Sequence, residues 1–550
     1  MNVKELSELG NGLFGKRSTL LSLWQEQADN FYPERADFTF QRSLGTDFAA
    51  NLMTSYPVLC RRDLGDQIST MLRPTAKEWF HWGLRDPYSD DNDTERFLEW
   101  ATKVQRRAMY DPVSMFTRAT KEGDHDFATF GQCAIRVRLN KAGDALLYTC
   151  FHLRDMAWSE NEEGKIGLIF RKWKPSARDL MRLFEDKVHF NVRKAATGIG
   201  QEPLTEFECM HMVVEADYYS ESAKGRPYWS ITYDVANDCT LEAVPVWNKE
   251  YAIPRWQTVS GSQYAFSPAT VAALPDARLI QAMTYTLLEA GEKVVNPPLV
   301  ATKDVVRSDM AVYAGGVTWV DRDYDEKLGE ALRPMTIDAK GMPLGIEMQT
   351  RSQQMLAAAF FLNKLTMPQR GPEMTAYEVG QRVEEYIRGA LPLFEPMEMN
   401  YNGEICELTR DLMMRAGAFG DPRNFPRKVR EAMSVGATQF RFESPLHDAI
   451  EAQKGQKFME MKGMIAEAAA FDKNALALPD TIVALRDALH GIKVPAKWIN
   501  SDTTVKAMKN AEQQAMAATQ TIQAAQAGAD VAATLATATK DMAAAVPMPA

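Results

Sequence analysis

Three glycines near the start of the chain come closest to a known chemical motif. The segment from Gly10 to Gly15 matches the phosphate-loop pattern GxGxxG, but Arg17 stands where the related pattern GxxxxGK[ST] needs a hydroxyl. Both phosphate loops need a strand before the glycines and a helix after them. Only nine residues precede Gly10, and they have a helical pattern. We therefore interpret this segment as a loop between two helices rather than a nucleotide site.

Histidine and acidic residues supply the second candidate. Asp124-His125-Asp126 resembles a small acid/base cluster, but we interpret it as a solvated turn after a helix at 113–121. No two of the seven histidines share the i,i+4 spacing of a helical metal pair, and Cys209-Met-His211 lacks further ligands. There is no GxSxG nucleophile motif. The sequence predicts no catalytic residue, no cofactor site and no metal ligand.

Aromatic and basic residues could contact nucleic acid at two places. Trp79, Phe80 and Trp82 could stack on bases, but their position favours a core anchor where a helix meets the first strand. Arg370 lies in a stiff segment, 368–372, which contains two prolines and a glycine and separates two helix patterns. This arginine could contact phosphates or could be a solvated loop cation, and the residues alone leave both interpretations open.

The composition is typical of a folded, water-soluble chain with several substructures. At 550 residues the chain is too long for one compact core, and its 45% hydrophobic and 25% charged residues are ordinary values. The formal net charge of −10 argues against a protein that grips nucleic acid, because phosphate binding needs Lys and Arg. It is compatible with a surface along which nucleic acid must slide.

The cysteines and the apolar segments limit the compartment. Six cysteines lie far apart with no CxxC pair, which favours a reducing cytoplasm over a disulfide framework. The first residues lack the pattern of a secretory signal, and no stretch approaches eighteen consecutive apolar residues. We expect no membrane span.

The first half of the chain changes from helix to strand patterns. Residues 1–130 are mostly helical in pattern, with a clear amphipathic helix at 95–110. Strand patterns follow up to residue 258, beginning with the alternating run 134–139 and a turn around Gly143. The helix pattern SARDLMRLF interrupts the strands. The sequence thus predicts fold class α+β.

Two long helix patterns with a small insertion between them come next. Pro275 suits the first turn of a helix that Asn296-Pro297-Pro298 ends. Residues 299–345 have the pattern of short strands and turns, and a second helix follows at about 347–363.

The last third of the chain is predicted to be largely helical. Thr375 and Glu378 form a capping box that begins a helix, which Pro392 and Pro396 must kink or break. TQFRFESPL is a strand candidate, helices follow at about 447–470 and 479–490, and the Ala-rich end gives little to bury.

Several segments resemble the head-to-tail connector, or portal, proteins of short-tailed double-stranded-DNA bacteriophages. In LGDQISTMLRPTAKEWFHWGL (64–84), a helix ends in a Pro turn that leads to Trp79-Phe80, with Arg73 where a threonine is more usual. PDARLIQAMTYTLLEAGEKVVNPPLV, TMPQRGPEMTAYEVGQRVEE, FRFESPLHDAIEA and GIKVPAKWINSD are also similar to the family and occur in its order. The resemblance spans most of the chain.

The resemblance implies a ring-forming portal fold with a fixed order of parts. A mixed α/β wing leads to a helical stem, a small α/β clip, a long kinked helix and a helical crown. The expected boundaries are N-terminal helices and wing 1–270, first stem helix 271–296, clip 297–345, second stem helix 346–363, tunnel loop 364–374, long kinked helix and return to the wing 375–445, crown 446–505, and an Ala-rich tail 506–550.

The resemblance also implies two sets of functional residues. The tunnel loop would line a DNA channel, with Lys364, Met367, Gln369, Arg370 and Glu373. The apolar faces of the stem would pack on neighbouring subunits, through Leu279, Ile280, Met283, Leu287, Met355, Leu356 and Phe360. We expect an obligate ring, generally twelvefold in this family, and no cofactor.

The function implied is structural: a portal at one capsid vertex, through which phage DNA is packaged and ejected. Its partners would be double-stranded DNA, the packaging ATPase (terminase large subunit), tail adaptor proteins, and the major capsid and scaffolding or internal core proteins. The chain would assemble in the host cytoplasm and reside in the virion. Two alternatives stay open: another ring-forming virion protein such as a tail adaptor, or a nucleotide-dependent enzyme acting on nucleic acid.

Overall fold

The computed structural model describes most of the first 301 residues and parts of the remainder. The described residues are 1–41, 43, 45–47, 49–85, 92–198, 202–301, 332–335, 341–365, 389, 396–442, 458–467 and single positions or short runs between 484 and 534. They form two compact units: Met1–Trp79 with Gln105–Ala418, and Phe80–Val104 with Phe419–Ala550. Each unit is described by itself.

The first unit begins with two consecutive helices, α1 (Val3–Lys16) and α2 (Ser18–Phe31). Asn2 accepts from the Glu5 amide and Glu5 reaches back, which is a complete capping box. The glycine cluster therefore lies inside α1, and the prediction of a loop there was wrong. The helix continues through its glycines. Gly10 allows α1 to pack closely, because a Cβ there would come within 2.6 Å of the Phe170 side chain.

Two further helices pack beside α2. They are α3 (Tyr56–Leu72) and α5 (Phe116–Phe130), and the short helix η1 (Pro33–Arg35) joins α2 to the segment before α3. Gly131, with a φ of +77°, ends α5 in the left-handed conformation that favours glycine. Asp124, His125 and Asp126 are buried residues of α5, so the prediction of a solvated turn there was wrong.

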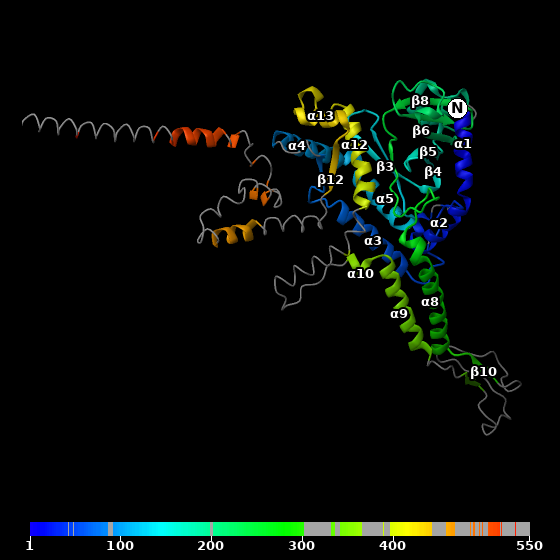
Figure 1. The fold of residues 1–550 in the computed structure, drawn as a ribbon. Helices are drawn as coiled ribbons and strands as arrows, with labels where there is room; N and C mark the ends of the chain where they lie inside the picture. The colour runs from blue at the N-terminus through cyan, green and yellow to red at the C-terminus, as the bar shows by residue number, and fades with distance from the viewer. Residues whose placement is uncertain are drawn as a thin grey trace, which may run out of the picture. The chain divides into compact units, whose positions relative to one another are not determined.

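Two antiparallel sheets form the centre of this unit (Figure 1). One has the strand order β3-β2-β9, the other β4-β5-β6-β7-β8. The strand patterns around 134–139, the turn at Gly143 and the later strands are confirmed. The bounds are β2 Ala134–Leu139, β3 Leu146–Phe151, β4 Met156–Glu160, β5 Ile166–Trp173, β6 Cys209–Glu215, β7 Tyr228–Asp234, β8 Cys239–Val246 and β9 Tyr251–Ala252.

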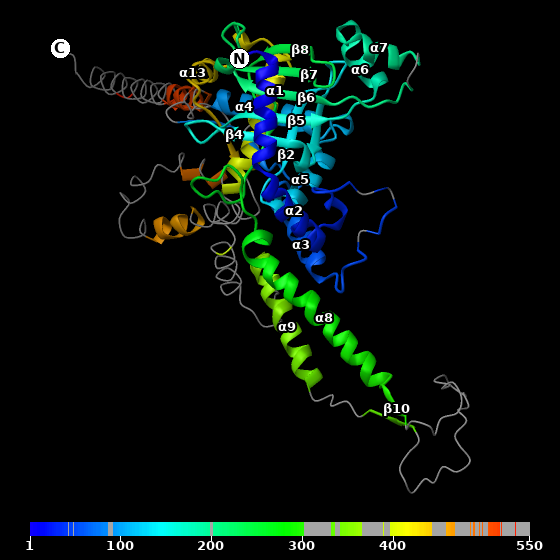
Figure 2. The ribbon, with the colours of Figure 1, turned by 90° about the vertical axis from the view of Figure 1, so that its right-hand side faces the viewer.

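The five-stranded sheet buries both faces. Helix α1 crosses one face (Figure 2), where Leu6 packs with alternating residues such as Phe170 and Met212. On the other face Ile169 and Val213 pack with α2 and the smaller sheet, around Trp24 and Tyr251. Because side chains alternate along each strand, one set of residues faces α1 and the next set faces the smaller sheet.

A small helical lobe covers one end of this sheet. It consists of α6 (Ala177–Phe184), which the pattern SARDLMRLF predicted correctly, and α7 (Phe190–Ala196). Leu180 and Val192 pack with Cys209 and Leu241 at the ends of the strands. Ser176 caps α6 by accepting from the Asp179 amide.

The helix pair α8 (Leu274–Val295) and α9 (Met342–Ala359) leads away from the sheets in both views (Figures 1 and 2). Pro275 lies in the first turn of α8 and Asn296 ends it, as predicted. Around this pair lie the π-helical turn η6 (Ala269–Ala273), the paired strands β10 (Leu299–Ala301) and β11 (Leu332–Pro334) and the short helix α10 (Leu362–Leu365). The π-helical turn η9 (Glu398–Gly403) leads into α12 (Glu404–Arg415), which packs on β2 and β9.

The second unit is organised around a two-stranded antiparallel sheet. Strand β1 (Phe80–Leu84) pairs with β12 (Thr438–Phe442), which confirms the strand predicted in TQFRFESPL. Trp82 packs on Phe419 at 4.9 Å and is buried, as the core-anchor interpretation predicted. This unit also contains α13 (Arg427–Val435) and the part of α4 (Asn92–Met109) up to Val104.

The predicted capping box at 375–378 and most of the crown lie outside the described residues, so those predictions stay untested. Among the described residues, no helix is both long enough and apolar enough to span a bilayer.

Gly10 offers a test of the packing between α1 and the sheet. We expect Gly10→Ala to destabilise this contact by about 1–3 kcal/mol, because its methyl group would displace the buried Phe170. Gly12→Ala in the same helix is the matched control, since a Cβ there meets nothing within 4 Å and alanine favours helix. Hydrogen exchange of α1 and the thermal midpoint measure the effect. Equal behaviour of the two variants would contradict the packing role.

Candidate functional site: the α8–α9 helix pair and its buried support

Helices α8 and α9 approach each other closely where Gly345 of α9 meets Leu287 of α8. A Cβ at Gly345 would come within 2.7 Å of Leu287, so glycine allows the close approach of the two helices. Gln349 of α9 donates a hydrogen bond to the Thr284 hydroxyl of α8 at 2.8 Å. The helices thus form one paired element rather than two separate rods.

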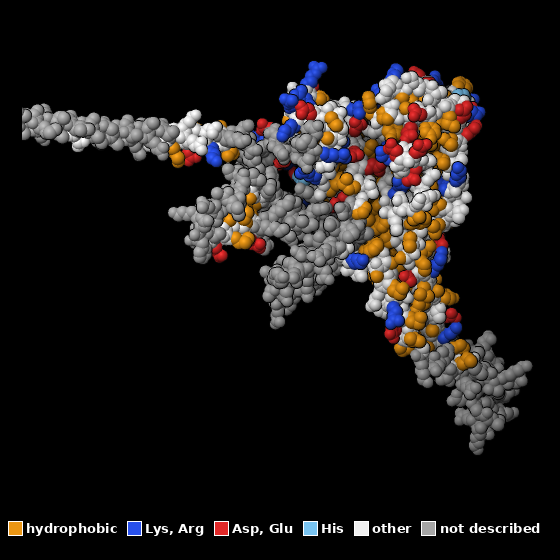
Figure 3. Space-filling view, viewed as in Figure 1, with side chains coloured by type: hydrophobic (Ala, Val, Ile, Leu, Met, Phe, Trp, Pro, Cys, Tyr) orange, Lys and Arg blue, Asp and Glu red, His pale blue; other side chains and the backbone are white. Residues whose placement is uncertain are grey.

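This helix pair exposes many large apolar side chains (Figure 3). On α8, Leu279 is 46% exposed and Leu288 is 60% exposed; on α9, Leu344 is 62% and Met355 is 54% exposed. Further exposed apolar residues on the pair are Tyr285, Val294, Val295, Ile346 and Met348. Contiguous apolar surface of this kind typically marks a protein–protein contact.

The predicted interface residues fall into two groups. Leu279 and Met355 are exposed, and Met283 and Leu287 are half-buried. The side chains of Ile280, Leu356 and Phe360 are fully buried within their own subunit, where Phe360 meets the ring of Phe31 at 5.4 Å. These three hold the pair against the N-terminal helices, so their side chains have no surface left for a neighbour. The interface stays a prediction for the first group.

The predicted channel residues are described only in part. Lys364 is exposed in α10, with its Nζ 5.8 Å from the centre of the Phe361 ring. Phe361, between α9 and α10, has a φ of +59°, so the helical backbone conformation is interrupted there and the chain turns. Met367, Gln369, Arg370 and Glu373 lie outside the described residues.

Polar contacts fix the start of α8 to the N-terminal segments. Arg278 makes two hydrogen bonds to the Glu26 carboxylate, at 2.6 and 2.7 Å. Gln281 accepts from the backbone amides of Met53 and Thr54 and donates to the Thr54 carbonyl. The position of the helix pair therefore depends on α2 and on the segment before α3.

Three consecutive residues of α5 are each bound by an arginine from another segment. Arg35 makes a bidentate ion pair with Asp126, at 3.0 and 2.8 Å. Arg73 pairs with Asp124, and Arg61 lies 3.1 Å from Nδ1 of His125. We call these six residues the α5 charge cluster. None of these arginines was predicted to be functional from the sequence, where the one signal was Arg73 at a position that is more usually threonine.

Arg73 is the most completely enclosed member of the α5 charge cluster. It is 4% exposed, donates to Asn402 Oδ1 at 2.6 Å and lies over the ring of Tyr401, 4.6 Å from its centre. Burial is the largest single influence and opposes its charge, but the attraction and hydrogen bond of Asp124, together with Tyr401 and Tyr110, outweigh it and raise the pKa of Arg73. Arg73 thus links the end of α3, α5 and the turn η9.

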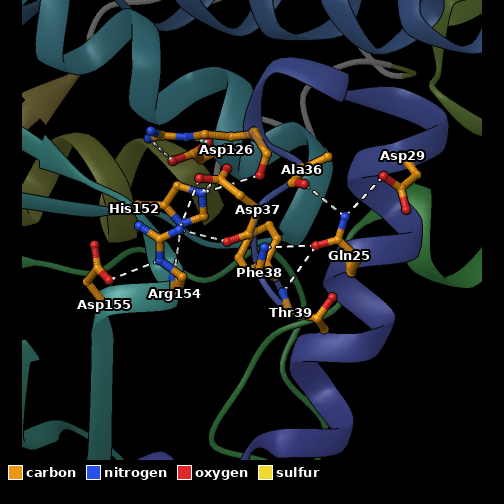
Figure 4. Close-up of polar contacts among 11 residues, drawn as sticks. Gln25, Asp29, Ala36, Asp37, Phe38, Thr39, Asp126, His152, Arg154 and Asp155 are labelled. Carbon is orange, nitrogen blue, oxygen red and sulfur yellow. Dashed lines mark hydrogen bonds and ion pairs between the residues drawn. The ribbon is translucent and has the colours of Figure 1, made fainter. Parts of the chain in front are cut away.

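A second polar network joins η1 to the segment before β4 (Figure 4). The Gln25 side chain accepts from the Phe38 amide at 2.8 Å and donates to the Ala36 carbonyl at 2.9 Å. Arg154 forms an ion pair with Asp37, with Nη1 3.0 Å from Oδ2. His152 lies beside them, and Arg35 reaches Asp126 from the same place.

This arrangement does not favour acid/base chemistry. Both α5 carboxylates are bound by arginines, and burial together with the charge of Arg61 lowers the pKa of His125 to about 4. A histidine that is neutral and enclosed in this way is a poor proton shuttle at pH 7. Among the described residues, no group of three or more His, Cys, Asp or Glu side chains could hold a metal. The α5 charge cluster is structural.

Removing one partner of the buried pair Arg73–Asp124 should destabilise the chain. Asp124→Leu leaves a buried guanidinium without its counter-charge, and we expect a loss of about 3–5 kcal/mol. Glu122→Ala, in the same helix, removes an exposed partner of Arg118 and should cost less than about 1 kcal/mol. Urea unfolding of the variants measures the difference. Arg73→Met combined with Asp124→Leu should recover much of the loss, and no recovery would contradict the pairing.

The buried histidines predict a loss of stability in acid. Burial, reinforced by Arg61 and Arg35, lowers the pKa of His125 to about 4 and of His152 to about 3, against an ordinary 6.5. As the pH falls, the unfolded chain therefore binds protons on these histidines at a higher pH than the folded chain does. The contribution of the two histidines to the free energy of unfolding is fully present above pH 6.5 and is lost as the pH drops toward 4. We expect His125→Gln to reduce this slope in thermal unfolding between pH 7 and 5. An unchanged slope would contradict the assignment.

Comparison with known proteins adds the family. Residues 3–499 match the family described as bacteriophage head to tail connecting protein. The chain is 23% identical over 416 residues to a probable portal protein of Bordetella phage BPP-1, and the match covers 74% of each chain. It is 22% identical over 327 residues to a portal protein of Salmonella phage epsilon15, and that match covers 58% of this chain and 57% of the relative. A solved chain from "Virion of native gene transfer agent (GTA) particle" aligns with 79% of this chain and 94% of its own, at 8% identity and a TM-score of 0.34. This chain belongs to the family of bacteriophage head-to-tail connecting proteins.

Proposed function

We propose that this chain is the portal of a phage capsid: a structural protein that forms a ring at one vertex, through which DNA is packaged and ejected. Membership of the connector family over residues 3–499 carries the proposal. Two relatives named portal proteins, from phages BPP-1 and epsilon15, support it.

The exposed apolar surface of α8 and α9 supports ring formation. A single subunit leaves Leu288 and Leu344 more than half exposed, which is costly for a pair of helices in water. Neighbouring copies that pack head to tail on this surface would bury it, and such an interface closes into a ring when its rotation divides a full turn. The predicted stem residues Leu279, Met283, Leu287 and Met355 would belong to this contact. The expected number of subunits in the ring is twelve, as the family resemblance implies.

The segment 364–374 is proposed to line the DNA channel. Lys364, Met367, Gln369, Arg370 and Glu373 would place charged and polar groups near passing phosphates. One arginine and one lysine per subunit attract DNA, while the overall charge of −10 limits how firmly the remaining wall can hold it. A duplex could then move through the ring without being retained by it.

The other parts are proposed to meet the partners of a portal. The insertion 297–345 between α8 and α9 would dock the packaging ATPase and later the tail adaptors, while wing and crown would meet capsid and scaffolding or internal core proteins. Energy for translocation would come from the ATPase. The helical geometry of Gly10–Gly15 supports this division, because a phosphate loop needs its glycines before a helix rather than within one.

Ring formation can be tested on the exposed stem residues. We expect Leu279→Glu with Met355→Glu to weaken each subunit contact by about 1–3 kcal/mol, because both carboxylates would be buried without partners. The folded subunit should be unaffected, since both side chains are exposed in it. Sedimentation velocity and negative-stain images measure the ring fraction.

The matched control is Leu279→Met with Met355→Leu, which keeps the surface apolar and should keep the rings. A wild-type chain that sediments as a stable monomer would reject the proposal. Intact rings in the glutamate variant would reject this surface as the interface.

A further inference from the structure

The contacts between α8 and α9 show which side of the helix pair each exposed residue lies on. Leu287 of α8 meets Gly345 of α9. Thr284, one turn earlier in α8, meets Gln349, one turn later in α9, so the two helices are antiparallel. Because an α-helix turns by about 100° per residue, this line of contact fixes the direction of every other side chain on the pair.

One side of the pair carries an apolar surface formed by both helices. On α8, Leu279 and Met283 lie about 90° from the line of contact, and on α9 Met355 lies about 110° from it. In two antiparallel right-handed helices these directions point to the same side of the pair. We call this side face one. It consists of Leu279, Met283 and Val294 of α8 and Leu344, Met348 and Met355 of α9, of which Met283 is half-buried and the others are exposed.

The opposite side carries a second apolar surface with different residues. Tyr285 and Leu288 are more than half exposed and lie about 100° from the line of contact, in the other direction. We call this side face two. Gln281, one turn before Tyr285, lies on the same side and binds the Met53 amide, so the segment before α3 borders face two. Face two consists of Tyr285, Leu288 and Val295 of α8 and Ile346 of α9, all of them exposed.

Beyond Leu279, each face has one exposed charged residue among its apolar residues, and the two charges are opposite. Arg351 of α9 lies on face one between Met348 and Met355, and Glu292 of α8 lies on face two, one turn beyond Leu288. Neither side chain forms an ion pair with a described residue. Face one packed on another face one would bring arginines together, whereas face one packed on face two brings opposite charges together.

Two different faces on opposite sides of one element suit a head-to-tail contact. A two-fold dimer needs one patch that fits itself, whereas a ring needs two patches that fit each other. Faces one and two are both apolar and extend along the helix pair for about 15–20 Å. Tyr285 supplies a rigid aromatic side chain, and the methionines of face one are flexible enough to pack around it. The surface that best complements face two is therefore face one of a second copy.

We propose that face two of each subunit packs on face one of its neighbour, so that Tyr285 and Leu288 of one copy lie against the leucines and methionines of the next. Every subunit in the ring then uses both sides of its helix pair. The inference rests on the proposed function, because it takes the ring as given. It adds the second surface of the contact, which includes none of the interface residues that the sequence predicted.

Two variants of the full chain that each block one face test the proposal. Tyr285→Glu with Leu288→Glu blocks face two, and Leu279→Glu with Met355→Glu blocks face one. Both variants should fold, since these side chains are exposed in the subunit, and circular dichroism checks this. In sedimentation velocity each variant alone should lose rings at least about tenfold relative to the wild type. Mixed in equal amounts, the two should form a dimer that grows no further, because each supplies the face that the other lacks.

The matched control is Ala282→Glu with Lys293→Gln, which makes the same change in net charge at exposed positions on the edge of α8 turned away from α9 and should keep the rings. Intact rings in the Tyr285 and Leu288 variant would overturn the inference and leave the proposed function standing. A mixture that stays monomeric would overturn it too, as would a dimer formed by either variant alone, since a face would then bind itself. A wild-type chain without rings would instead reject the proposed function, and this inference with it.

Discussion

Two packed helices cannot bury all of their own apolar surface, and this constraint governs the first unit. Each helix of the α8–α9 pair can turn only part of its circumference toward its partner or toward α2 and α3. Ile280, Leu356 and Phe360 occupy that part and are fully buried. Leu279, Leu288, Leu344 and Met355 are left on the outside. A chain that keeps such residues exposed needs further copies of itself or another protein to cover them, and a closed ring does so with one kind of contact.

The buried charges beneath the helix pair contribute specificity more than stability. Burying an ion pair costs desolvation that its attraction only partly repays, so the α5 charge cluster is weak evidence for a highly stable unit. Each arginine, however, accepts only one arrangement of its neighbours. Arg73 reaches Asp124 and Asn402 together, which fixes the end of α3 against α5 and η9. Arg278 and Glu26 then fix α8 to α2. We infer that these contacts set the angle at which the helix pair leaves the sheets.

Helices and strands were predicted correctly from the sequence where the periodicity is unambiguous. The predictions were wrong where tertiary contacts outweigh the local preference of the residues. The alternation in 134–139 and the proline in the first turn of α8 each have one physical interpretation, and both predictions were correct. Gly10 looked like a loop residue because its reason for being glycine, the ring of Phe170, is far away in sequence. Asp124 and Asp126 looked solvated because their arginines lie 51 and 91 residues earlier. The burial of Ile280 within its own subunit could not be predicted either. Apolar periodicity identifies the apolar face of a helix but does not show whether the subunit's own core or a neighbouring subunit packs on that face.

Buried arginines of the first unit are held in two ways, by carboxylates and by aromatic rings. Arg35 and Arg73 are buried against carboxylates, and Arg61 against His125 and the ring of Tyr32. Arg171 has no carboxylate partner among the described residues and lies over the Phe151 ring, 3.8 Å from its centre, as Arg61 lies over the ring of Tyr32. An aromatic face can thus accompany a buried guanidinium where the chain offers it no carboxylate, because the negative face of the ring attracts the cation.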